Sequence, residues 1–192
     1  EFLSFSRQAA RLEEDGAEIR RIGVEPFETF PARFVAALKK DSYDLVYLSQ
    51  VFFDSGLRVG DEALEEIAFA AYESAELVID GSHGFMAVPQ SLQKIGSQAF
   101  YLASGYKYAQ AGEGLCLLAV PPDCGLRPVN TGWLADAPSR PSAAVSGPIG
   151  YANDGRRFWG SSFDPTALHR FNAVMAWREA EGITVERSDA HT

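Results

Sequence analysis

The stretch that decides the fold is residues 61–80, which read DEALEEIAFAAYESAELVID. Its first half places apolar side chains at helical spacing, and its early acidic residues favour the positive end of a helix dipole. The apolar positions are Ala63, Leu64, Ile67, Ala68 and Ala71. Residues 76–79 then form a short apolar run that ends at Asp80, which is typical of a buried strand. This stretch predicts a helix followed by a strand.

The same alternation extends in both directions along the chain. Strands are expected at residues 17–24, 44–48, 76–79, 99–103 and 115–120. Helices are expected over the first residues up to Asp15-Gly16, from Thr29, from Asp61, over 91–95, and from Asp164-Pro165 to Gly182. The last helix has a stripe of Leu168, Phe171, Val174 and Met175 that we expect to face the core. The order predicts an α/β fold, with a mostly parallel sheet covered by helices on both faces.

Composition narrows the possible partners. The chain has 192 residues, 46% of them apolar, which suits one folding unit with a sizeable core. A net charge of -9 disfavours nucleic acid and anionic membranes, so we expect small molecules or other proteins as partners. With two cysteines and no apolar run of about 18 residues, a cytoplasmic protein is expected. Scattered histidines, including His169 and His191, suggest no metal site.

Two strand ends carry candidate chemistry. Asp80 follows one apolar strand and precedes Gly81-Ser82-His83-Gly84, so its carboxylate can point into a ligand crevice or simply cap a turn. Lys107 follows the next strand in Ser104-Gly105-Tyr106-Lys107, where desolvation would favour its neutral, nucleophilic amine. A surface loop lysine is the ordinary alternative. Together, an anion and an amine on successive strand ends are what the ring nitrogen and the aldehyde of pyridoxal 5'-phosphate (PLP) require.

Five segments carry a resemblance to a known family. They are residues 78–83, 100–107, 112–114, 132–133 and 157–162. With these segments the chain resembles the class V aminotransferase family of fold-type I PLP-dependent enzymes, most closely its kynureninase-like branch. The resemblance implies a PLP-binding large-domain core at 1–120, an irregular region with interface contacts at 121–163, and at 164–192 a helix leading towards a small C-terminal domain that is not present.

The resemblance also implies a role for each site residue. Lys107 would hold PLP as a Schiff base, Asp80 would pair with the pyridine nitrogen, and His83 would lie near the phenolic oxygen. Tyr106 and Ser104 fall in the phosphate-side segment. Trp133 and Ser162 fall in segments that, in the family, reach the phosphate of a neighbouring subunit, which implies a homodimer with shared sites. For Trp133, an aromatic plug under a loop is the equal alternative.

The implied activity is that of a PLP-dependent enzyme acting on an amino acid or a related amine. Transamination, kynureninase-like C–C hydrolysis and C–S lysis share their first half and stay open. A catalytically silent PLP-fold binding module is a further alternative, and a nucleotide-binding protein is disfavoured because no glycine-rich G-x-G-x-x-G or Walker sequence occurs. The chain departs from the family at Phe52 and Phe53, where the family often has Asn or Tyr, so we expect a changed substrate pocket.

Overall fold

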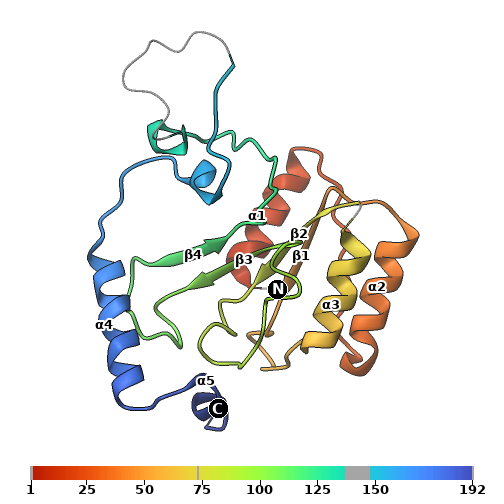
Figure 1. Cartoon of the computed structure of the whole chain (residues 1–192). Helices are drawn as coiled ribbons and strands as arrows, with labels where there is room; N and C mark the ends of the chain where they lie inside the picture. The colour runs from red at the N-terminus through yellow and green to blue at the C-terminus, as the bar shows by residue number, and fades with distance from the viewer. Residues whose placement is uncertain (1, 73, 137–147, 192) are drawn as a thin grey trace.

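The computed structural model describes residues 2–72, 74–136 and 148–191, so part of the irregular region expected at 121–163 lies outside the described residues. Its centre is a four-stranded sheet in the order β1-β2-β3-β4 (Figure 1). The strands are β1 (Leu45–Ser49), β2 (Glu76–Asp80), β3 (Ala99–Ser104) and β4 (Cys116–Ala119). β1, β2 and β3 are parallel, whereas β4 runs antiparallel to β3. The chain is therefore an α/β protein with a small, mostly parallel sheet.

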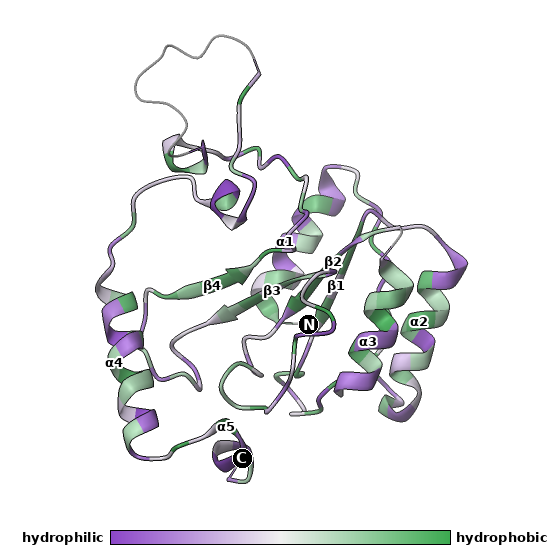
Figure 2. Ribbon diagram, in the orientation of Figure 1, coloured by the Kyte–Doolittle hydropathy of each residue, from purple (hydrophilic) through white to green (hydrophobic). Residues whose placement is uncertain are grey.

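Helices lie on both faces of this sheet. α2 (Phe30–Lys40) and α3 (Asp61–Ala71) pack side by side over one face, while α1 (Leu3–Glu14) lies on the other (Figure 1). The core between the sheet and the helix pair is apolar, and it includes Phe30, Leu64, Ile67, Leu77 and Ile79, all almost fully buried. Figure 2 shows the matching pattern, with strands coloured as hydrophobic and helices that alternate between the two colours. Burying these stripes is what the period of 3.6 in the helices and the apolar strand runs predict.

The prediction of a strand at 17–24 is wrong, because this segment forms neither a strand nor a helix. Its apolar residues do pack, since Ile22 and Val24 lie against the core. Its carbonyls bind a side chain instead of a neighbouring strand: the Arg33 guanidinium donates to the carbonyl oxygens of Gly23 and Val24, at 2.7 and 3.1 Å. An arginine on α2 thus satisfies backbone acceptors that a sheet ladder would otherwise use.

The short helix expected at 91–95 is also wrong. Residues 93–98 form turns, in which the Ile95 and Gly96 amides donate to the Leu92 carbonyl oxygen. Forming a single helical turn fixes several backbone dihedral angles but makes few hydrogen bonds. The turn therefore gains too little free energy to extend into a helix. The link from β2 to β3 is therefore a series of turns between two parallel strands.

The C-terminal helices lie near the end of the sheet where β3 stops and β4 starts (Figure 1). They are α4 (Thr166–Ala180) and α5 (Val185–Asp189). An ion pair connects α5 to the segment after β1, with 2.8 Å between Arg58 Nη1 and Asp189 Oδ1. The predicted start of α4 is confirmed, because the Asp164 carboxylate accepts from the Thr166 amide at 2.9 Å. Its expected core-facing stripe is only half-buried, and Leu168 is exposed. Ala167 and Arg178 are the buried residues of this helix.

The connection after β4 contains two single-turn 3-10 helices, η2 (Trp133–Asp136) and η3 (Gly155–Phe158), which contact each other. None of the helices in the part of the chain that the structure describes has both the length and the apolar character needed to cross a membrane.

Candidate functional site

The predicted site residues Asp80, His83 and Lys107 lie at or just beyond the carboxyl ends of β2 and β3. Asp80 is the last residue of β2 and is buried. Its Oδ1 accepts from the Ser82 amide at 2.9 Å, and its Oδ2 accepts from the Tyr47 hydroxyl at 2.6 Å. Each carboxylate oxygen has two lone-pair positions, so both can accept a further donor. Asp80 combines the turn capping of the simpler interpretation with a second contact from the neighbouring strand β1.

Lys107 lies three residues beyond β3 and directly contacts His83. The distance from Lys107 Nζ to His83 Nε2 is 2.9 Å. His83 comes from the turn after Asp80, so two segments that are 24 residues apart in the sequence meet here. The pair of an amine and an imidazole within hydrogen-bond distance can share or pass a proton. This contact brings two of the predicted site residues, His83 and Lys107, together.

The surroundings shift the pKa values of both bases, Lys107 and His83, downward. Burial lowers the pKa of Lys107, and the negative charge of Asp80 opposes this shift only in part. Burial also lowers the pKa of His83, the nearby positive charge of Lys107 lowers it further, and Asp80 acts in the opposite direction. A lysine whose pKa is lowered carries more free amine at neutral pH, which is the nucleophilic form. The desolvation expected from the sequence is thus present at Lys107.

Aromatic rings surround the Lys107 amine. Its Nζ lies 5.3 Å from the centre of the Phe2 ring and 5.8 Å from that of Tyr106. Phe53 lies edge-on to Phe2, with ring centres 6.0 Å apart, and 6.3 Å from the His83 ring. Phe2, Phe53 and Tyr106 are partly exposed, so the space beside the amine is apolar and open to solvent. Phe53 therefore supplies an apolar wall where the family pattern often has a polar side chain.

Two glycines let the turn after Asp80 lie flat on the end of the sheet. A Cβ atom on Gly81 would lie 1.9 Å from Tyr101 Cζ, and one on Gly84 would lie 2.1 Å from Gln50 Oε1. Tyr101 and Gln50 also bind each other, since the Tyr101 hydroxyl donates to Gln50 Oε1 at 2.9 Å. Only residues without a side chain fit over this pair. The glycines thereby fix the path that carries His83 to Lys107.

The remaining predicted residues lie at different places. Ser104 ends β3, half-buried and paired with Cys116 of β4, while Tyr106 is partly exposed next to Lys107. Trp133 is 71% exposed, and Ser162 is exposed as well. Their segments lie together, because a Cβ on Gly132 would lie 1.6 Å from the Gly160 carbonyl oxygen. Among the described residues, no hydrogen bond or ring contact joins Trp133 or Ser162 to Lys107, so their reach to a neighbouring subunit stays a prediction.

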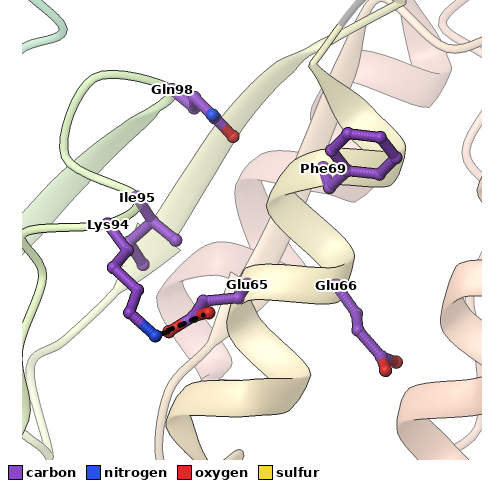
Figure 3. Close-up of a pocket in the computed structure, with 6 residues that line it drawn as sticks. All are labelled: Glu65, Glu66, Phe69, Lys94, Ile95 and Gln98. Carbon is purple, nitrogen blue, oxygen red and sulfur yellow. Dashed lines mark hydrogen bonds and ion pairs between the residues drawn. The ribbon is translucent and has the colours of Figure 1, made fainter.

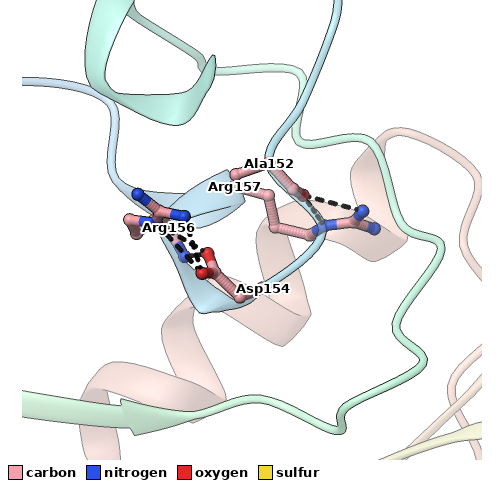
Figure 4. Close-up of polar contacts among 4 residues, drawn as sticks. All are labelled: Ala152, Asp154, Arg156 and Arg157. Carbon is pink, nitrogen blue, oxygen red and sulfur yellow. Dashed lines mark hydrogen bonds and ion pairs between the residues drawn. The ribbon is translucent and has the colours of Figure 1, made fainter. Parts of the chain in front are cut away.

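Arg157 organises the region that carries Trp133 and Ser162. Its buried guanidinium donates to the carbonyl oxygen of Ala152 from Nε and Nη2, at 3.1 and 3.0 Å (Figure 4). It also donates to the carbonyl oxygens of Leu126, at 3.0 Å, and of Cys124. The neighbouring Arg156 instead pairs with Asp154 at the surface, as Figure 4 shows. One arginine thus joins the segment at 124–126 to the segment at 152–157 through three backbone carbonyl groups.

A surface hollow away from this site contains the lysine that contrasts best with Lys107. It has a volume of about 360 Å³ and lies between α3 and the turns before β3 (Figure 3). Its lining residues are Glu65, Glu66, Phe69, Lys94, Ile95 and Gln98. Lys94 Nζ lies 2.8 Å from Glu65 Oε1, and its hydrogen bond to Glu65 raises the pKa of Lys94. The ion pair thus favours the protonated form of this amine, the opposite of the shift at Lys107.

Sequence reasoning missed three residues at the site: Tyr47, Gln50 and Phe5. Tyr47 and Gln50 come from β1 and the residue that follows it, and Phe5 comes from α1. One signal could have indicated Tyr47: if β1 and β2 pair in parallel, alternation puts Tyr47 on the face of Val78 and Asp80. The contacts of Gln50 and Phe5 depend on tertiary packing, which no local pattern encodes.

The donor set fits PLP in its chemistry. A buried carboxylate with free acceptor capacity, an amine whose pKa is lowered and a neighbouring imidazole are the groups that a pyridine nitrogen, an aldehyde and a phenolic oxygen require. Neither the models of known protein families nor the curated proteins contain a match to this chain.

Proposed function

We propose that this chain is the central part of a PLP-dependent enzyme that acts on an amino acid or a related amine, as the resemblance to the class V aminotransferase family implies. The observation that carries the proposal is the pair at neighbouring strand ends: Asp80, buried and hydrogen-bonded, and Lys107, whose pKa is lowered by burial. A partly buried amine and a buried carboxylate near the carboxyl ends of adjacent parallel strands lie where α/β proteins commonly bind their ligands.

In this proposal each residue has a distinct task. PLP, when bound, supplies an electron sink that disperses negative charge developing on the substrate. Asp80 would accept a hydrogen bond from the N–H of the cofactor ring, and Lys107 would hold the cofactor through its amine. The Lys107 amine, when not engaged in this way, would carry a proton at the α-carbon of the substrate. His83, 2.9 Å from Lys107 Nζ, can keep the amine oriented and exchange a proton with it.

The segments with Trp133 and Ser162 complete the site of a second subunit in this proposal. Trp133 is 71% exposed, and Val129 and Phe163 of the same region are exposed too. A large exposed aromatic side chain beside other apolar residues is typical of a surface that a partner covers. The rigid frame that Arg157 builds would hold this surface in shape before association.

An absorption spectrum tests the proposal. The purified protein mixed with PLP should gain a band in the visible or near ultraviolet that differs from that of free PLP, and borohydride should abolish it while leaving PLP attached. Lys107→Ala should lose both the band and the attachment. Lys94→Ala is the matched control, because Lys94 is an ion-paired surface lysine, and it should keep both.

The same experiment separates the proposal from its alternatives. A catalytically silent module that has lost the cofactor would give the spectrum of free PLP with the wild-type chain. A band that survives in Lys107→Ala would contradict the assignment of the lysine. Once the band is established, incubation with a panel of amino acids, followed by analysis of the products, would distinguish transamination from C–C or C–S bond cleavage.

A further inference from the structure

The carboxylate of Asp80 is not held by its own strand alone. The hydroxyl of Tyr47, on the adjacent strand β1, donates to Asp80 Oδ2 at 2.6 Å, while the Ser82 amide holds Oδ1. A hydrogen bond to an ionised acceptor is shorter and stronger than one between neutral groups. Two donors on different oxygens fix the rotation of the carboxylate as well as its position.

Tyr47 is itself held in place from the other side. The ring of Phe5, on α1, stacks on the ring of Tyr47 with centres 3.5 Å apart and planes inclined by 10°. Both side chains are half-buried, so the stack lies between α1 and the sheet. α1 therefore contacts Asp80 through one intermediary, Tyr47. These two contacts, Phe5 with Tyr47 and Tyr47 with Asp80, connect α1 to the buried carboxylate of the site.

We propose that Tyr47 is a positioning residue, which aims the Asp80 carboxylate at the ring nitrogen of the cofactor, and that Phe5 keeps the Tyr47 hydroxyl in place. This inference rests on the proposed function. Tyr47 would not touch the cofactor, and its effect on the ring nitrogen would pass through the Asp80 carboxylate. Its loss should weaken only those interactions that involve the ring nitrogen, whereas a tyrosine that merely supports the fold would affect every ligand equally.

A comparison of two ligands distinguishes these roles. The first is PLP, and the second is its 1-deaza analogue, in which a C–H group replaces the ring nitrogen. Asp80 therefore has no ring N–H from which to accept a hydrogen bond. The dissociation constant of each is measured by absorption titration for the wild type and for Tyr47→Phe. We expect the wild type to bind PLP more tightly than the analogue. Tyr47→Phe should reduce this preference, measured as the ratio of the two dissociation constants, about tenfold, which is the usual contribution of one hydrogen bond to a charged group.

Two further variants complete the design. Tyr101→Phe is the matched control, because it removes a tyrosine hydroxyl that binds Gln50 instead of Asp80, and it should keep the preference within about twofold. In an Asp80→Asn background, Tyr47→Phe should cause no further loss of preference, because the two residues act through one contact. Thermal unfolding of the unliganded variants checks that each one folds.

The outcomes separate this inference from the proposed function. A wild-type protein that attaches no PLP at Lys107 would overturn the proposed function and the inference with it. A wild-type protein that attaches PLP and prefers it to the analogue, combined with an unchanged preference in Tyr47→Phe, would overturn the inference alone. An equal loss of affinity for both ligands would likewise show that Tyr47 only supports the fold.

Discussion

Lys107 and Lys94 show how the surroundings of a single residue decide its chemistry. Burial lowers the pKa of Lys107, whereas the contact with Glu65 raises the pKa of Lys94. The two amines belong to the same residue type and lie 13 positions apart in the sequence. Their different surroundings, and not their intrinsic chemistry, should make one a nucleophile and the other a cation.

This contrast predicts a pH-dependent difference in reactivity. As the pH rises, Lys107 should lose its proton first, because its pKa is lowered, so its reaction with an acylating reagent should begin at a lower pH than that of Lys94. Competitive labelling with a trace of acetic anhydride, read by peptide mass spectrometry across a pH series, measures both lysines in one sample. Identical pH profiles for the two would contradict the role of desolvation at Lys107.

At the scale of the element, the turn after β2 depends on glycine. Gly81→Ala would place its Cβ 1.9 Å from Tyr101 Cζ, and the Tyr101 ring is tied to Gln50 through its hydroxyl. Relief requires a shift of the ring or of the turn, so we expect a loss of about 1–3 kcal/mol in the free energy of unfolding. Urea denaturation measures this loss.

Gly23→Ala is the control for this prediction. No atom lies within 4 Å of a Cβ built at Gly23, so this variant should unfold within about 0.5 kcal/mol of the wild type. A Gly81→Ala protein as stable as Gly23→Ala would show that the turn has room that the structure does not indicate.

The elements also show which parts of the fold the sequence could predict. The strands β1, β2, β3 and β4 and the helix α3 follow from apolar runs and helical periodicity, because burial imposes those patterns on the residues themselves. Residues 17–24 contain four apolar side chains among three charged ones, and no strand forms there, because the Arg33 guanidinium binds the carbonyl oxygens of Gly23 and Val24. That outcome depends on a side chain from another element, which a local pattern does not contain.

The residues of the candidate site also differ in whether the sequence could predict them. Asp80 and Lys107 could be predicted because each follows an apolar strand, and the ends of parallel strands meet at one edge of a sheet. Phe5 could not, because its contact with Tyr47 depends on how α1 packs on the sheet, and Tyr47 could be predicted only once the parallel pairing of β1 and β2 is assumed. The apolar stripe of α4 predicted a buried face, but this helix buries Ala167 and Arg178 instead.

At the scale of the whole molecule, the exposed surface around Trp133 predicts self-association. We expect the chain to sediment as a dimer, and Trp133→Ala to shift the equilibrium towards the monomer, because buried aromatic side chains contribute much of the energy of an interface. Sedimentation velocity over a range of concentrations measures this shift.

Trp177→Ala provides the comparison for the dimer prediction. Trp177 is 50% exposed on α4, a different part of the surface, so its removal should leave the sedimentation unchanged. If Trp133→Ala and the wild type sediment identically at every concentration, the shared-site interpretation of the Trp133 and Ser162 segments is wrong.

The most direct test of the central claim locates the attached cofactor on the chain. The sequence contains four lysines, Lys39, Lys40, Lys94 and Lys107, so peptide mass spectrometry after borohydride reduction with PLP can assign every site of attachment. We predict a single modified lysine, Lys107, at PLP concentrations that leave the other three unmodified. Modification spread over Lys39, Lys40 and Lys94, with Lys107 no more modified than they are, would contradict it.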